Sequence, residues 1–86
     1  MKDDDAKIYS DVRASLNTLR VDASKIRIRV ASHKVFLSGE LHKLGGMPMN
    51  RAKLLGNLKS GISKIRGVRM VVVESDLEAF VRRTGS

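Results

Sequence analysis

The sequence predicts an α+β fold, a two-layer sandwich in which two helices cover one face of a three-stranded sheet. Three observations predict it. Two segments carry apolar residues at helical spacing, two shorter segments alternate apolar and polar residues, and another short segment is rich in β-branched residues. Each helix has one apolar stripe, and both stripes can be buried together against one side of a small sheet. The order of elements is α-β-β-α-β.

The first helix is predicted over residues 4–19, because its apolar residues recur four, four and three positions apart. These residues are Ile8, Val12, Leu16 and Leu19. Three aspartates at 3–5 supply candidates for the N-cap. They also give a negative first turn that suits the positive end of the helix dipole.

A β-hairpin is predicted next. Residues 25–30 alternate strictly, with Ile26, Ile28 and Val30 on one face and basic residues on the other. Residues 35–41 alternate again, and the intervening segment 31–34 is short enough for a tight turn. The basic residues of the first strand are Lys25, Arg27 and Arg29.

A glycine- and proline-containing loop at 44–48 precedes the second helix, predicted over 49–65. Its apolar residues are Ala52, Leu55, Leu58, Ile62 and Ile65. Gly67 is expected to end this helix, and residues 68–73 form the third strand. The domain therefore covers residues 4–74. In the C-terminal tail, 75–86, the apolar residues are spaced i, i+3 and i+4, which fits either one docked helical turn or a frayed end.

A right-handed crossover from the second strand through the second helix predicts that the third strand lies beside the first, in the spatial order 2-1-3. The first strand is then central. Its Lys25, Arg27 and Arg29 stand on the sheet face that the two helices leave open. The alternative is that the tail folds over and covers this face.

The excess positive charge lies in one block of the chain. The formal net charge is +8, and residues 25–69 carry eleven Lys and Arg against Glu40 as the sole acid. Such a field favours an anionic partner: phospholipid, nucleic acid or an acidic protein surface. The alternative without a binding function is that the basic block keeps a small domain soluble.

The sequence predicts no enzyme, no cofactor and no metal site. It has no cysteine, which excludes a thiol nucleophile and a Cys-ligated zinc. His33 and His42 have no ligand or acid–base partner at a diagnostic spacing, so a structural or solvent role is expected for both. The aspartates at 3–5 lack the glycine and the distal glutamate of a calcium loop.

The predicted binding site is the basic row together with its neighbours. Residues two apart on a strand present their side chains to one face, so the row can meet phosphate groups at a pitch of ~6.5–7 Å. The predicted anion-binding residues are Lys25, Arg27, Arg29, Lys34 and Arg69. Apolar contacts are expected from Phe36, Met70 and Val72. A face that mixes cations with large apolar side chains is unlike a purely solvated surface.

Two short motifs add a resemblance to a known family. They are Val35-Phe36-Leu37-Ser38-Gly39, where the glycine suits a close backbone approach, and Gly67-Val68 followed by Val71, where the glycine suits a left-handed conformation. The supporting residues are Asp5, Ile8, Val12, Leu16, Ile26, Ile28, Val30, Ala52 and Ile62. Over residues 5–73 the chain resembles the BON domain. The resemblance implies an α-β-β-α-β sandwich without catalytic activity that binds phospholipid membranes or partner proteins.

Three functions follow, in order of preference. The first is a BON-like module that attaches to anionic membrane surfaces, or to a membrane-associated partner, through the basic sheet face. The second is a protein–protein assembly domain, similar in element order to the ring-building modules of secretion systems, which forms homo-oligomers through its sheet edges. The third is nucleic-acid binding, ranked last because the chain has no Trp and only three aromatic rings of Phe and Tyr. The sequence shows no signal peptide, so the expected location is cytoplasmic, or either periplasmic or membrane-associated for a BON domain cut from a longer protein.

Overall fold

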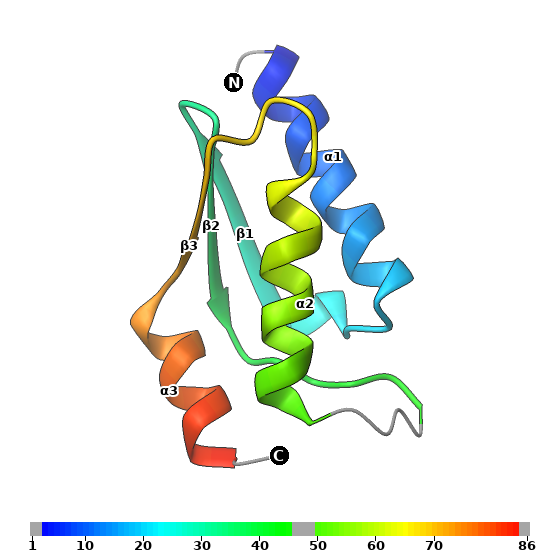
Figure 1. Ribbon diagram of the computed structural model, residues 1–86, viewed down its shortest axis with the longest axis vertical. Coiled ribbons are helices and arrows are strands. Elements are labelled where there is room, and N and C mark those ends of the chain that lie inside the picture. The colour runs from blue at the N-terminus through cyan, green and yellow to red at the C-terminus, as the bar shows by residue number, and fades with distance from the viewer. Residues whose placement is uncertain (1–2, 46–49, 85–86) are drawn as a thin grey trace.

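The computed structural model describes residues 3–45 and 50–84, which form three helices and a three-stranded mixed sheet in the order α-β-β-α-β-α (Figure 1). The elements are α1 Asp3–Thr18, the 3-10 helix η1 Ala23–Lys25, β1 Ile26–Ala31, β2 Lys34–Gly39, α2 Arg51–Ser63, β3 Met70–Val73 and α3 Ser75–Thr84. The predicted helix–hairpin–helix–strand order is confirmed. The start of the predicted second helix and the predicted loop residues 46–48 lie outside the described residues.

The strands stand in the order β1-β2-β3, so the predicted order 2-1-3 is wrong. β1 and β2 are antiparallel, and β3 lies parallel to β2 on its other side. The crossover through α2 therefore places β3 directly beside β2, the strand that precedes the crossover. β2 is then the central strand. Val35 and Leu37 of β2 are fully buried, whereas Ile28 in the middle of β1 is only half-buried. β2, whose core-facing residues are the more deeply buried, is thus the middle strand of the sheet.

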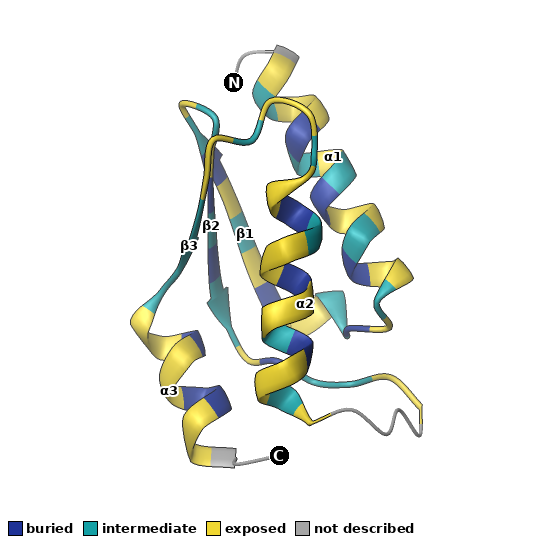
Figure 2. Cartoon of the chain, viewed as in Figure 1, coloured by how far each residue is buried: buried dark blue, intermediate teal, exposed yellow. Residues whose placement is uncertain are grey.

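The core lies between the sheet and the helices, and α1 and α2 stand on the same side of the sheet (Figures 1 and 2). The predicted α1 stripe is confirmed for Ile8, Val12 and Leu16, which are buried, whereas the predicted Leu19 follows the end of α1 and is half-buried. The stripe of α2 is rotated from the predicted one. Its buried residues are Leu54, Leu58 and Ile62. The predicted Leu55 and Ile65 are only half-buried, and Ala52 is exposed.

The C-terminal tail is a helix of ten residues, not a single turn or a frayed end. α3 packs against β2 and α2, and it lies beyond the end of β3 with its buried residues turned toward α2 (Figure 2). Leu77, Phe80 and Val81 belong to the same core cluster as the residues of α1 and α2. α3 therefore extends the helical layer and, over the described residues, does not cover the open face of the sheet.

Positive backbone angles end α1 and close the hairpin. Arg20, at φ 59°, ends α1 in a Schellman arrangement, in which the amide of Val21 donates to the carbonyl of Leu16 at 2.9 Å. The β1–β2 turn is the two-residue loop Ser32-His33, with φ values of 50° and 65°. Two consecutive positive angles match the twist of a tight hairpin. The predicted turn at 31–34 is confirmed.

Candidate functional site

The open face of the sheet gathers most of the predicted binding residues. The register places Arg29 of β1 beside Phe36 of β2, which in turn lies beside Val72 of β3. The next row toward the hairpin holds Lys34 beside Met70. Alternation along the strands turns these side chains away from the core. Val71 and Val73 pack against the core cluster, whereas Phe36, Met70 and Val72 are outside it.

We call this surface the open sheet face and define it by the residues that share it. They are Arg27, Arg29, Lys34, Phe36, Ser38, Met70 and Val72. Met70 is 51% exposed, and it is one of two large hydrophobic residues of the described part that are so exposed. The face thus has an apolar centre with cations along the β1 side and at the hairpin end.

Arg29 has two partners on this face. Its guanidinium lies over the Phe36 ring, 4.2 Å from the ring centroid, and 3.9 Å from the Glu74 carboxylate. Both charged side chains remain largely solvent-exposed, at 67% and 41%, so the ion pair is weak. Glu74 is a residue of the site that sequence reasoning missed. Its only signal in the sequence was an acid immediately after the third strand.

The edge of β1 widens the candidate site. Because β1 is an edge strand and not the central one, a shallow depression of about 440 Å³ runs along it, from Tyr9 of α1 to Phe36 on the open face. The Arg27 and Arg29 side chains line this depression. Arg27 takes part in no ion pair among residues 3–45 and 50–84.

Lys25 does not belong to the row. The strand begins at Ile26, and Lys25 is the last residue of η1. Its charge acts on two carboxylates, Asp22 and Glu40, and contributes to lowering the pKa of each. Its carbonyl accepts a hydrogen bond from the amide of Glu40 at 2.9 Å. Lys25 therefore already has acidic neighbours and stands apart from the open sheet face.

Lys34 and Arg69 meet at the hairpin end of the sheet. The amide of Arg69 donates to the carbonyl of His33 at 2.8 Å, and Lys34 is paired with Met70. Both basic side chains are exposed. The structure thus brings the backbone of Arg69 to the hairpin end of the sheet, one residue before the Met70 that pairs with Lys34.

The two histidines hold loops in place. His33 Nδ1 lies 3.0 Å from the carbonyl oxygen of Gly67, and His42 Nε2 lies 2.9 Å from Glu40 Oε1. The His42 ring also contacts the Phe80 ring, with centroids 5.1 Å apart. Within the described residues, no three His, Asp or Glu side chains are grouped to hold a metal ion. No helix in the described ranges is both long and apolar enough to cross a membrane.

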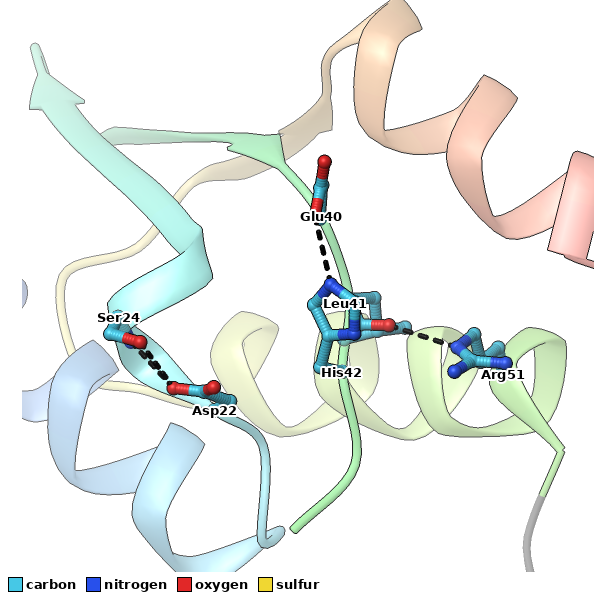
Figure 3. A network of polar contacts seen from close by, with 6 residues as sticks. All are labelled: Asp22, Ser24, Glu40, Leu41, His42 and Arg51. Atoms are coloured by element: carbon cyan, nitrogen blue, oxygen red, sulfur yellow. Dashed lines mark hydrogen bonds and ion pairs between the residues drawn. The ribbon is translucent and has the colours of Figure 1, made fainter.

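A polar network stabilises the junction beside Lys25 (Figure 3). Ser24 donates to Asp22 Oδ1 from its hydroxyl at 2.6 Å and from its amide at 3.0 Å, and these bonds lower the pKa of Asp22. The hydrogen bond with His42 lowers the pKa of Glu40. Arg51 Nε donates to the carbonyl of Leu41 at 3.0 Å and ties α2 to the segment after β2.

These lowered pKa values predict acid sensitivity. A carboxyl with a lower pKa in the folded state stabilises the fold above its ordinary pKa, and the contribution is lost as pH falls through the folded value. The ordinary values are 3.8 for Asp22 and 4.5 for Glu40, so the loss begins below pH 4.5. We expect Asp22→Asn with Glu40→Gln to be less stable than the wild type at pH 6, with a difference that narrows toward pH 3. Thermal unfolding of the variant and the wild type between pH 6 and pH 3 measures the difference in stability. A difference that stays constant over this range would contradict the prediction.

Comparisons with known proteins add no relative. No family model matches this chain. No curated protein matches it, and no solved structure does.

Proposed function

We propose that this chain is a non-enzymatic module that attaches to anionic phospholipid membrane surfaces through the open sheet face. The observation that supports it is an apolar centre, Phe36 with Met70 and Val72, that lies outside the core and is bordered by Arg27, Arg29 and Lys34. The resemblance to BON domains points to the same class of function.

The two kinds of side chain have separate tasks in this proposal. Each basic residue held near an acidic leaflet contributes ~1 kcal/mol, so three of them give reversible attachment. Phe36 and Met70 add burial of apolar surface at the headgroup boundary. Glu74 opposes attachment, because its carboxylate lies near Arg29 and repels lipid phosphates. Attachment therefore exchanges a weak ion pair for contacts with headgroups.

Sedimentation with vesicles tests the proposal. We expect vesicles containing phosphatidylglycerol to retain the protein at low salt and phosphatidylcholine vesicles not to. Arg27→Glu with Lys34→Glu should weaken retention about thirtyfold or more, since two contributions of ~1 kcal/mol are lost and two repulsions are added. Glu74→Gln should strengthen it. Lys25→Glu should have little effect, because Lys25 stands apart from the open sheet face.

The matched control is Lys53→Glu with Lys59→Glu, which changes the net charge equally on the exposed surface of α2. This variant should bind markedly better than the sheet-face variant. Equal losses in the two variants would show that only net charge matters and would refute the site. Retention on phosphatidylcholine vesicles would refute the proposed function. A short DNA or RNA that competes fully with the vesicles would favour nucleic-acid binding instead.

The free sheet edges favour one other function, assembly through strand pairing. Within the described residues no strand pairs with the outer edge of β1 or of β3. Unpaired edges are templates for pairing with another chain. Concentration-dependent sedimentation would support an assembly domain that pairs through these edges. A monomer at high concentration would exclude this alternative.

A further inference from the structure

A second cationic feature lies at the hairpin end of the molecule. The first turns of α1, the β1–β2 turn and the segment between α2 and β3 come together there, at the upper end of Figure 1. They enclose a cleft of about 310 Å³, which we call the hairpin-end cleft. Its lining residues are Asp4, Lys7, Ile8, His33, Arg66 and Gly67. None of these is part of the open sheet face.

The walls of the cleft are held together by contacts between distant segments. The His33 ring is bonded to the carbonyl of Gly67 at 3.0 Å, and the carbonyl of His33 accepts from the amide of Arg69 at 2.8 Å. Gly67 has φ +97°, and a Cβ there would lie 3.3 Å from Ile8 Cδ1. The loop is thus close-packed against α1, and the cleft is formed before any ligand arrives.

The charge in and around the cleft is positive. Lys7 and Arg66 are exposed and line it from opposite segments. Neither is in an ion pair with a residue whose side chain is described, 4–45 and 50–83, and Asp4 is the single acid among the described lining residues. The same segments also carry Lys34, Lys64 and Arg69, and two further acids, Asp3 and Asp5, so the cations along them outnumber the acids by five to three. An anion in the cleft would therefore find two unpaired cations and a field of the same sign around it.

We propose that the hairpin-end cleft binds a phosphomonoester group. Arg66 supplies the planar pair of N–H donors that matches phosphate oxygens, and Lys7 supplies a second positive charge. A monoester has three terminal oxygens and carries up to two negative charges, so it can engage both cations at once, whereas a diester has one charge and two free oxygens. His33 is a positioning residue, because its ring fixes the turn against Gly67. This inference does not depend on the proposed sheet-face function.

Titration with glycerol 3-phosphate in about 0.15 M salt, where long-range charge effects are screened, tests the site. Amide NMR signals of His33 and Gly67 are expected to shift. Lys7→Gln with Arg66→Gln should weaken binding about tenfold or more, as expected for lost charge-assisted hydrogen bonds. Asp4→Asn should strengthen it. Lys53→Gln with Lys59→Gln removes equal charge elsewhere and should leave the affinity unchanged. The proposal would be overturned if both double variants weakened glycerol 3-phosphate binding equally. It would also be overturned if the amide signals that shift lay only outside the hairpin-end cleft.

Two further arms distinguish the source of the phosphate. If the monoester belongs to a lipid headgroup, vesicles containing phosphatidic acid should bind more tightly than phosphatidylglycerol vesicles of equal surface charge, and Lys7→Gln with Arg66→Gln should abolish the difference. If it belongs to a free metabolite, glycerol 3-phosphate binds but the two vesicles are bound equally. Both results support the cleft. If Arg27→Glu loses vesicle binding and still binds glycerol 3-phosphate with unchanged affinity, the cleft and the open sheet face are separate sites. If the protein binds glycerol 3-phosphate but no vesicles at all, the proposed sheet-face function is refuted and the cleft proposal stands.

Discussion

Replacing Gly39 by alanine is expected to destabilise the fold by at least about 3 kcal/mol, from backbone strain and a steric clash together. Gly39 ends β2 with φ +106°, and a Cβ would lie 2.4 Å from the carbonyl oxygen of Lys25. That neighbour is a backbone atom of η1, immediately before the paired strand β1, and it cannot rotate away as a side chain could. The Gly39 amide also donates to Asp76 Oδ2 at 3.1 Å, so the same shift would disturb the start of α3. A chain of this length has a total stability of only ~4–13 kcal/mol.

Urea denaturation followed by circular dichroism measures this loss. The matched control is Gly56→Ala in α2, where a Cβ meets nothing within 4 Å. That change should stabilise the protein by ~0.5–1 kcal/mol, because alanine is the better helix former. A Gly39→Ala protein as stable as the wild type would contradict the close approach of β2 to Lys25.

Replacing Leu77 by alanine is the second change with a large expected effect, a loss of ~2–5 kcal/mol. Leu77 is fully buried and joins α3 to the core, in the segment that the sequence left open as a docked turn or a frayed end. Removing its side chain leaves a cavity between α3, β2 and α2. The matched control is the same substitution at Leu44, which is 42% exposed and should cost less than ~1 kcal/mol.

The urea midpoint and slope of both leucine variants measure the difference. An unchanged slope with a lower midpoint for Leu77→Ala would indicate a cooperative domain that includes α3. Equal midpoints for the two variants would mean that α3 is peripheral to the core. That result would reopen the question of what covers the open sheet face, since the uncovered state of that face depends on α3 being docked on the helical layer.

Local patterns were sufficient for α1, the hairpin, α2 and β3 and for most of the core, but not for the length of α3. The spacing of Ile8, Val12 and Leu16 depends only on helix geometry, and the alternation in the two hairpin strands depends only on the pleat. A four-residue segment between two alternating runs leaves room only for a tight turn. The close backbone approach at Gly39 and the left-handed conformation of Gly67 could also be predicted, because only glycine tolerates them without a Cβ penalty.

The strand order was not accessible in this way. The crossover rule restricts the handedness of the connection between two parallel strands, but it does not say which strand the third one pairs with. The third strand could therefore lie beside either strand of the hairpin. The two possible positions of β3 differ in how much apolar surface is buried between segments that are far apart in the sequence. With β3 on β2, the short strand packs beside Val35 and Leu37 and is followed by α3, whose Leu77 closes the core at that end.

The candidate site shows the same division. Composition and the two-residue period of a strand are local properties. They were therefore enough to predict that cations alternate along β1, that Phe36 shares a face with them, and that one block of the chain is strongly basic. Tertiary packing set the rest: β1 is an edge strand, Lys25 lies near Asp22 and Glu40, Glu74 approaches Arg29, and Lys7 and Arg66 line one cleft. Those are contacts between residues distant in the chain, and packing of the whole domain is what brings them together.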